Sequence, residues 1–233
     1  IDYTGLVRTN RPTTTKIRVI GGHQQMLRLD FEDASAVDGD YMKQYLSYID
    51  GKLNESMDCV IISDYGKGSC TEFAAQHIIR AAHDHGVPVI IDPKGTQWAK
   101  YKDADYITPN LKEINEVLLE PIANEDFDVE KAARYVMRKF SIRNLILTRS
   151  EKGLSIVHGD EVAHIPTHAQ EVFDVSGAGD TVIAVFGLAL AGGLKPADGA
   201  YLAASVVVSK VGTYAVSREE LLAVLDREEG VTA

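Results

Sequence analysis

The sequence predicts an α/β fold, with a mainly parallel central sheet, helices on both faces and a small β-hairpin near the N-terminus. Three observations carry this prediction. Short, continuous apolar runs such as Cys59–Ile62 and Val87–Ile91 recur along the chain, as buried parallel strands require. Longer stretches with helical spacing alternate with these runs, which is typical of a sheet covered on both faces. Two short runs flank Gly21-Gly22 and indicate a hairpin with a glycine-dependent turn.

The expected strands are short. The N-terminal hairpin joins Lys16–Ile20 to Gln25–Phe31. The buried strands of the central sheet are expected at Cys59–Ile62, Val87–Ile91, Tyr106-Ile107 and Leu145–Leu147. A second hairpin is expected at the sheet edge, with strands at Leu154–Val157 and Glu161–Ile165 joined across Gly159-Asp160.

The expected helices lie between and after these strands, where apolar residues recur at helical spacing. Gly86 should end one of them, because glycine commonly follows the last turn of a helix. The helices are expected at Val37–Leu53, Thr71–His85, Leu111–Leu119, Val129–Phe140, Thr181–Ala191, Ala197–Lys210 and Arg218–Asp226. The chain is thus expected to divide into a β lid element with its connection over residues 1–35 and an α/β core over residues 36–233.

Composition excludes several classes of protein. The 233 residues carry 34 acids against 24 Lys and Arg, a net charge of −10, so nucleic acid is not expected as a partner. No apolar run approaches the roughly 20 residues that span a bilayer, and no secretory signal pattern is visible. Two cysteines, Cys59 and Cys70, cannot form a disulfide framework. We therefore expect a reducing, cytoplasmic environment and no membrane partner.

Polar residues follow four successive strands of the expected sheet. In open parallel sheets, ligands bind beyond the carboxyl ends of the strands, so these residues mark the expected site. They are Ser63-Asp64-Tyr65-Gly66-Lys67-Gly68, Asp92-Pro93-Lys94-Gly95, Thr108-Pro109-Asn110 and Thr148-Arg149-Ser150.

The strongest motif is the run from Asp174 to Thr181, Asp-Val-Ser-Gly-Ala-Gly-Asp-Thr, directly before a long apolar helix. Gly177, Ala178 and Gly179 lack bulk, so their backbone N–H groups can approach an anion at the positive end of the helix. Asp180 stands beside that anion hole and can take a proton from a substrate hydroxyl during phosphoryl transfer. The plain alternative is close helix packing with Asp180 as a cap.

A second motif is Asn110-Leu111-Lys112-Glu113 at the expected start of a helix. The spacing of three puts Asn110 and Glu113 on one side. The family resemblance described in the next paragraph implies a Mg²⁺ ion near this pair, and a single Glu suffices there because Mg²⁺ keeps several of its waters. The alternative is a capping box, in which both residues only close the helix end.

These motifs resemble those of the PfkB/ribokinase-like family of carbohydrate kinases. The resemblance implies a ribokinase-like fold, ATP and Mg²⁺, with Asp180 as catalytic base and Gly177, Ala178 and Gly179 as the anion hole. It also implies that Asn110 and Glu113 place Mg²⁺ and nucleotide phosphate, with Glu113 acting through water. The remaining nucleotide-binding positions implied are Thr148, Arg149, Glu151, Gly153, Asp174, Lys210 and Gly212. For the segment Thr148–Gly153 the alternative is a hairpin connection, and for Lys210 a solvated cation at a helix end.

From Thr13 to Leu221, several stretches are more similar to the heptose 7-phosphate kinases of that family than to ribokinase or fructokinase. They include Thr15–Val19, Gln24–Asp30, Ser63–Gly68, Ile91–Thr96 and Gln170–Val175. The implied reaction is ATP-dependent phosphorylation of the anomeric hydroxyl of D-glycero-D-manno-heptose 7-phosphate. The 1,7-bisphosphate product serves ADP-heptose and lipopolysaccharide synthesis.

A phosphorylated sugar would need basic groups in an acidic protein. Lys67 and Lys94 follow two strands, and Arg18 lies on the hairpin that is expected to cover the site, so all three are candidates for a distal phosphate. Each is alternatively a plain surface charge. Asp64 is a candidate for binding a sugar hydroxyl, or a strand-end turn residue.

The family's Gly- and Asn-rich N-terminal signature and first βα unit have no counterpart here, so we expect the chain to hold the ATP-binding part of a larger kinase domain. No H-x-G-H motif of a nucleotidyltransferase is present, which fits a monofunctional kinase or a piece of a fused enzyme. The resemblance further suggests a homodimer through the hairpin, and it leaves a monovalent cation site open. Another PfkB sugar kinase and a non-catalytic nucleotide-binding module remain alternatives, whereas no G-x-G-x-x-G supports a dehydrogenase.

Overall fold

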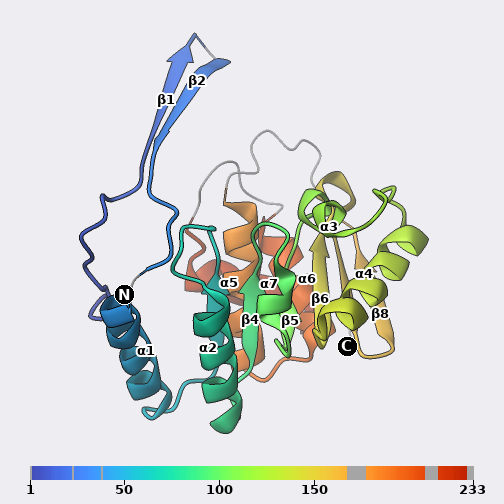
Figure 1. Cartoon of the computed structure of the whole chain (residues 1–233). Helices are drawn as coiled ribbons and strands as arrows, with labels where there is room; N and C mark the ends of the chain where they lie inside the picture. Colours follow the sequence, from blue (N-terminus) through green and yellow to red (C-terminus); the bar gives the residue numbers. More distant parts are fainter. Residues whose placement is uncertain (1, 23, 38, 167–176, 208–214, 230–233) are drawn as a thin grey trace.

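The computed structural model describes residues 2–22, 24–37, 39–166, 177–207 and 215–229. They form a six-stranded sheet in the order β3-β4-β5-β6-β7-β8 and a separate two-stranded sheet, β1-β2 (Figure 1). Strands β3 to β6 pair in parallel, and β7 and β8 extend the edge antiparallel. The strands are β1 (Thr15–Gly21), β2 (Gln24–Phe31), β3 (Val60–Ser63), β4 (Val89–Asp92), β5 (Tyr106–Ile107), β6 (Asn144–Thr148), β7 (Leu154–His158) and β8 (Glu161–Ile165).

Helices cover both faces of the large sheet, as the sequence predicts. The parallel strands lie side by side in chain order, so right-handed connections put the intervening helices on one face. The later helices cover the other face. The first layer holds α1 (Gly39–Leu53), α2 (Glu72–Asp84), α3 (Leu111–Val117) and α4 (Asp126–Phe140); the second holds α5 (Ala178–Ala191), α6 (Pro196–Val207) and α7 (Arg218–Glu229).

The core is divided by the sheet into two layers, because successive side chains of a strand point to opposite faces. In β4, Val89 and Ile91 join the core on the α1–α4 side, and Ile90 joins the core under α5 and α6. All three side chains are fully buried. This explains why β4 shows no polar alternation in the sequence: both of its faces are covered.

Local signals set the ends of the helices. At the start of α2, the hydroxyl of Thr71 accepts a hydrogen bond from the N–H of Ala74 at 3.1 Å. At its end, Gly86 has φ of +71°, the left-handed conformation that glycine adopts readily, so the expected stop is confirmed. Helix α4 begins three residues earlier than expected, at Asp126, with Glu125 in its N-cap position.

Two short 3-10 turns were not foreseen: η1 (Trp98–Tyr101) and η2 (Ser150–Lys152). In η1, Trp98 and Tyr101 are completely buried, and the indole N–H of Trp98 donates to the carbonyl of Gly95 at 2.8 Å. The turn therefore holds the loop after β4 against the core, which matters for the site described below.

The hairpin β1-β2 projects away from the large sheet (Figure 1). Its pairing puts Thr15 opposite Phe31, Ile17 opposite Leu29 and Val19 opposite Leu27, so one face is almost wholly apolar. The other face carries Lys16, Arg18, Arg28 and Asp30. The side chains of Ile17, Val19, Leu27, Leu29 and Phe31 are between 41% and 58% exposed, so the described chain leaves this apolar face largely uncovered.

Arg11 ties the base of the hairpin to the core. Its guanidinium donates to the carbonyls of Ser35 at 2.8 Å, Asp33 at 2.6 Å and Lys67 at 2.6 Å. The Lys67 ammonium in turn pairs with the carboxylate of Glu32. The loop after β3 is thereby fastened to the hairpin stem. None of the described helices is long and apolar enough to cross a membrane.

Candidate active site

The ends of β3 and β4 lie close to the start of α5, where part of the set of predicted site residues is placed. The strand ends align, because Ser63 is paired with Asp92 and Ile91 with Ile107. Beyond the strands, the N–H of Asp64 donates to the carbonyl of Asp92 at 3.0 Å. The loops after β3 and β4 are therefore neighbours where a ligand is expected.

Helix α5 begins with the glycine-rich motif. Gly177 has φ of +79°, a left-handed conformation that disfavours any residue with a Cβ. Its carbonyl accepts hydrogen bonds from the backbone N–H and the hydroxyl of Thr181, both at 3.0 Å. Ala178, Gly179 and Asp180 form the first helical turn, so their N–H groups lie at the positive end of the helix, as expected.

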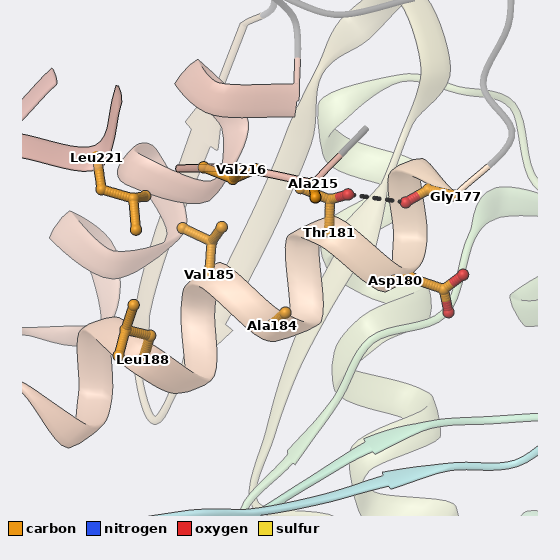
Figure 2. Close-up of a pocket in the computed structure, with 9 residues that line it drawn as sticks. All are labelled: Gly177, Asp180, Thr181, Ala184, Val185, Leu188, Ala215, Val216 and Leu221. Carbon is orange, nitrogen blue, oxygen red and sulfur yellow. Dashed lines mark hydrogen bonds between the residues drawn. The ribbon is translucent and has the colours of Figure 1, made fainter. Parts of the chain in front are cut away.

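A pocket of about 440 Å³ runs along one face of α5 (Figure 2). Gly177 and Asp180 stand at one end, and Leu188 and Leu221 line the other. Binding pockets of small molecules have volumes of this order. The pocket is polar at the end that carries the motif and apolar along the rest, a combination that suits a ligand with a charged and an uncharged part.

Tyr65 links the loop after β3 to the motif. Its hydroxyl donates a hydrogen bond to Oδ1 of Asp180 at 3.1 Å, across 115 residues of sequence. The two groups come from different elements, one from the end of a strand and one from the start of a helix.

Asp64, the expected contact of a sugar hydroxyl, is a buried carboxylate that is held by protein partners. Its side chain is 2% exposed. Oδ2 accepts from the Tyr101 hydroxyl at 2.7 Å and pairs with Lys100, and Oδ1 accepts from the N–H of Gly66 at 2.7 Å. Burial alone would raise the pKa of Asp64, but these donors outweigh it and hold the pKa below its usual value.

The Asn110–Glu113 motif forms a complete capping box at the start of α3. Oδ1 of Asn110 accepts from the N–H of Glu113 at 2.9 Å, and Oε2 of Glu113 accepts from the N–H of Asn110 at 3.1 Å. The capping box that the sequence analysis gave as the alternative is therefore fully formed. The other carboxylate oxygen, Oε1, is 3.1 Å from the ammonium of Lys94, so this Glu also faces the loop after β4.

Asp92 gives the clearest sign of unbalanced charge at the site. Burial, together with the nearby carboxylates of Glu113 and Asp180, raises its pKa to about 7. Lys94 is the cation that partly offsets this effect. Carboxylates from β4, α3 and α5 are therefore close enough to repel one another, a setting that a divalent cation would relieve.

The described residues contain no group of three His, Cys, Asp or Glu side chains placed to hold a metal ion directly. Mg²⁺ retains several waters and is commonly bound by one or two carboxylates plus substrate phosphates. The arrangement around Glu113 and Asp92 fits a water-mediated ion and not a closed protein cage.

Arg149, an expected contact of nucleotide phosphate, is buried among protein partners. Its side chain is 1% exposed, and its guanidinium donates to Asn124 Oδ1 at 2.9 Å, Asp126 Oδ1 at 2.6 Å and Ser155 Oγ at 2.9 Å. It fastens β6, β7 and the start of α4 together. Because these donors are already satisfied, Arg149 is a structural hub of the sheet edge.

The neighbours of Arg149 lie at the expected strand end. Thr148 forms a parallel bridge with Asn110, so these two predicted positions are adjacent. Glu151, in η2, accepts from the side-chain amide of Asn124 at 3.3 Å. Gly153 has φ of +80°, and its carbonyl accepts from the N–H of Arg149 at 2.7 Å. These contacts are also those of a hairpin connection, the alternative given for Thr148–Gly153.

The three basic candidates for a distal phosphate are not brought together. Lys94 pairs with Glu113, and its side chain is 54% exposed. Lys67 instead pairs with Glu32 at the hairpin stem. Arg18 lies within the projecting hairpin, opposite Arg28. Three further predicted positions, Asp174, Lys210 and Gly212, lie outside the described residues.

The sequence motifs did not single out Tyr65, Asp92, Lys100 or Tyr101. Tyr65 and Asp92 stand in the polar runs after β3 and β4, and their position at strand ends was an available signal. Lys100 and Tyr101 belong to η1, where no pattern marks them as partners of Asp64.

Comparisons with known proteins agree on one family. A family model described as "pfkB family carbohydrate kinase" matches residues 1–220. The "Bifunctional protein HldE" of Geobacter sulfurreducens is 40% identical over 99% of this chain and 48% of its own length. That of Syntrophotalea carbinolica is 42% identical over 91% of this chain and 44% of its own length. The chain spans about half the length of the curated relatives it matches.

Solved structures share the fold at low sequence identity. The ribokinase of Thermotoga maritima has a TM-score of 0.70 at 24% identity, covering 96% of this chain and 73% of its own. The phosphofructokinase-2 of Escherichia coli, in its tetrameric inhibited form, has a TM-score of 0.71 at 16% identity, covering 95% and 72%. The fold is therefore ribokinase-like, as the sequence predicts.

Proposed function

Because this chain belongs to the pfkB family of carbohydrate kinases, we propose that it transfers the γ-phosphoryl group of ATP to the anomeric hydroxyl of a phosphorylated heptose. The proposed substrate is D-glycero-D-manno-heptose 7-phosphate and the product its 1,7-bisphosphate, for ADP-heptose and lipopolysaccharide synthesis. Two findings support the choice of sugar: the stretches shared with heptose 7-phosphate kinases and the roughly 40% identity to HldE proteins.

The observation that carries the proposal is the position of Asp180. It stands in the first turn of α5, three residues after the left-handed Gly177, and lies close to Tyr65 after β3 and to Asp92 at the end of β4. A carboxylate beside a row of helix N–H groups combines a proton acceptor with an anion site. Phosphoryl transfer needs both at one place.

The proposed step is an in-line displacement. The sugar hydroxyl gives its proton to the Asp180 carboxylate as its oxygen forms a bond to the γ-phosphorus. The bond between that phosphorus and the bridging oxygen breaks, and ADP leaves with the electron pair. The N–H groups of Gly177, Ala178 and Gly179 stabilise the negative charge on the phosphoryl oxygens.

Glu113 and Asn110 are proposed to place the nucleotide phosphates and, through water, the Mg²⁺ ion that neutralises phosphate charge when bound. Lys94 is the cation beside Glu113, and the hydrogen bond with Glu113 raises its pKa, so it stays charged. We assign Lys94 to a phosphate of one of the two substrates. Thr148, Glu151 and Gly153, beside Asn110, remain proposed neighbours of the nucleotide. The proposal does not specify whether a monovalent cation is also needed.

The wider setting is proposed on the same basis. The apolar face of the hairpin suits a homodimer through residues 1–35, the proposed lid element. Relatives described as bifunctional suggest work alongside a nucleotidyltransferase. The free, partly buried Cys59 and Cys70 suit the reducing cytoplasm.

The experiment that tests this function is an ADP-release assay on the intact gene product with a panel of sugars. Heptose 7-phosphate would be compared with ribose, fructose and fructose phosphates at equal concentrations. Selective turnover of the heptose phosphate supports the proposal. Turnover of another sugar alone would support a kinase activity but exclude the heptose phosphate as its substrate. If no sugar is turned over although ATP still binds, the chain is a non-catalytic nucleotide-binding module.

A further inference from the structure

We propose that Tyr65 is a positioning residue for the reaction: its hydroxyl holds one oxygen of the Asp180 carboxylate and thereby orients the other toward the acceptor hydroxyl. The proposal rests on the proposed kinase function, in which Asp180 is the base. The geometry is direct, since the Tyr65 hydroxyl donates to Asp180 Oδ1 at 3.1 Å.

The turn that presents Tyr65 is fixed on both sides of the residue. On one side Asp64 is buried and held by Tyr101 and Lys100. On the other, Gly66 has φ of +66° and donates its N–H back to Asp64 Oδ1 at 2.7 Å. A residue between two such anchors has little backbone freedom, so the core fixes the point from which the Tyr65 side chain extends toward Asp180.

The same loop is held farther along. The carbonyl of Lys67 accepts from Arg11, and the carbonyl of Gly68 accepts from the N–H of Val37 at 3.0 Å. The loop therefore connects the hairpin stem, the buried Asp64 and the candidate base. This chain of contacts explains why an exposed tyrosine is held against a carboxylate of a distant helix.

The chemistry of the pair suits a donor that stays protonated. A hydrogen bond with Ser63 lowers the pKa of Tyr65, but burial and the charges of Asp180 and Asp92 outweigh it and raise the pKa above its usual value. The phenol thus remains a donor at neutral pH. A carboxylate has two oxygens, so engaging Oδ1 leaves the acceptor function to Oδ2. Fixing a base within a small angular range is what proximity effects in catalysis require.

The test is Tyr65→Phe in the intact protein, which removes the hydroxyl and keeps the ring. Tyr65 is 57% exposed, so the thermal midpoint should stay at the wild-type value. We expect kcat with the accepted sugar to fall about tenfold, equivalent to about 1.4 kcal/mol. The KM for ATP should change by less than about twofold, because the lost hydrogen bond orients the base for proton transfer and is not assigned to nucleotide binding.

The matched control is Tyr135→Phe, a tyrosine with 37% exposure on α4, in the helix layer opposite α5. It should keep the wild-type kcat. A Tyr65→Phe variant with wild-type kcat overturns the inference and leaves the kinase intact. If the KM for ATP of the Tyr65→Phe variant rises as much as its kcat falls, Tyr65 only supports the structure of the loop, and the inference is wrong. A wild-type protein without turnover on any sugar would reject the proposed function, and this inference with it.

Discussion

At the scale of single residues, Asp64 is a buried carboxylate at a strand end that holds the loops of the site through contacts with other protein groups. Its carboxylate joins the loop after β3 to η1 through Gly66, Tyr101 and Lys100. The side chain is almost completely buried, so its negative charge depends on these partners. As a result, the loops that carry Tyr65 and Lys94 are held in place.

Replacing Asp64 by Ala should lower the free energy of unfolding by about 3 kcal/mol, because Lys100 and Tyr101 lose a buried partner. The pKa of Asp64 is lowered in the folded protein, so its stabilisation is present above the unfolded value of 3.8 and is lost as pH falls through the folded pKa. The difference between the two proteins should therefore narrow below about pH 4.

Urea unfolding at several pH values measures both effects. The control is Asp58→Ala, an exposed carboxylate just before β3, which should change stability by less than about 0.5 kcal/mol. Equal losses in the two variants would contradict the structural role given to Asp64.

The candidate site was predictable from the sequence to the extent that motifs are local. The glycine-rich start of α5 and the Asn110–Glu113 pair are contiguous in the sequence, and the resemblance to a kinase family led to the expectation that they are more than helix caps. Residues that meet these motifs only through tertiary contacts could not be predicted from the sequence. The Tyr65–Asp180 hydrogen bond spans 115 residues. The contacts of Arg149 with Asn124, Asp126 and Ser155 likewise join segments that no local motif connects.

At the scale of elements, the sequence predicted the type and order of the described strands and helices, because both faces of the large sheet are buried and leave a clear apolar pattern. The turns η1 and η2 were missed because three or four residues carry no period. Among the described glycines, Gly68 in the loop after β3 has the closest approach to another part of the backbone. A Cβ at Gly68 would lie 1.7 Å from the carbonyl oxygen of Ser35, and φ there is +81°.

Gly68→Ala should therefore cost about 3 kcal/mol of stability and displace Tyr65, because backbone must move to admit the methyl group. Gly159→Ala is the matched control, with φ of +57° but nothing within 4 Å of the added Cβ. Its cost should be about 1 kcal/mol, from backbone strain alone. Equal unfolding midpoints for the two variants in urea would rule out the close contact with Ser35.

At the scale of the whole molecule, the hairpin and the site are parts of one connected structure. Arg11 and the Lys67–Glu32 pair fasten the hairpin stem to the loop that carries Tyr65. An isolated two-stranded hairpin is marginally stable in water, and a contiguous exposed apolar face commonly marks an interface. A second copy of the chain covering that face would stabilise the hairpin and, through the stem, the loop.

Leu29→Asp should turn a dimer into a monomer in sedimentation experiments on the intact protein, since a charge would be placed in the centre of the apolar face. Arg18→Ser, on the charged face of the same hairpin, is the control and should leave the dimer unchanged. A monomeric wild-type protein at micromolar concentration, or a Leu29→Asp protein that still dimerises, would contradict the proposed interface.

The central claim is that Asp180 is the base of an ATP-dependent sugar kinase, and Asp180→Asn tests it most directly. The amide keeps the shape of the helix start and the N–H groups of the anion site but cannot take the proton. ADP release with heptose 7-phosphate should fall at least about a hundredfold, while ATP binding measured by calorimetry stays within about threefold of wild type. If turnover persists, or if ATP affinity falls as steeply as the rate, Asp180 is a helix cap and the account of the site is wrong.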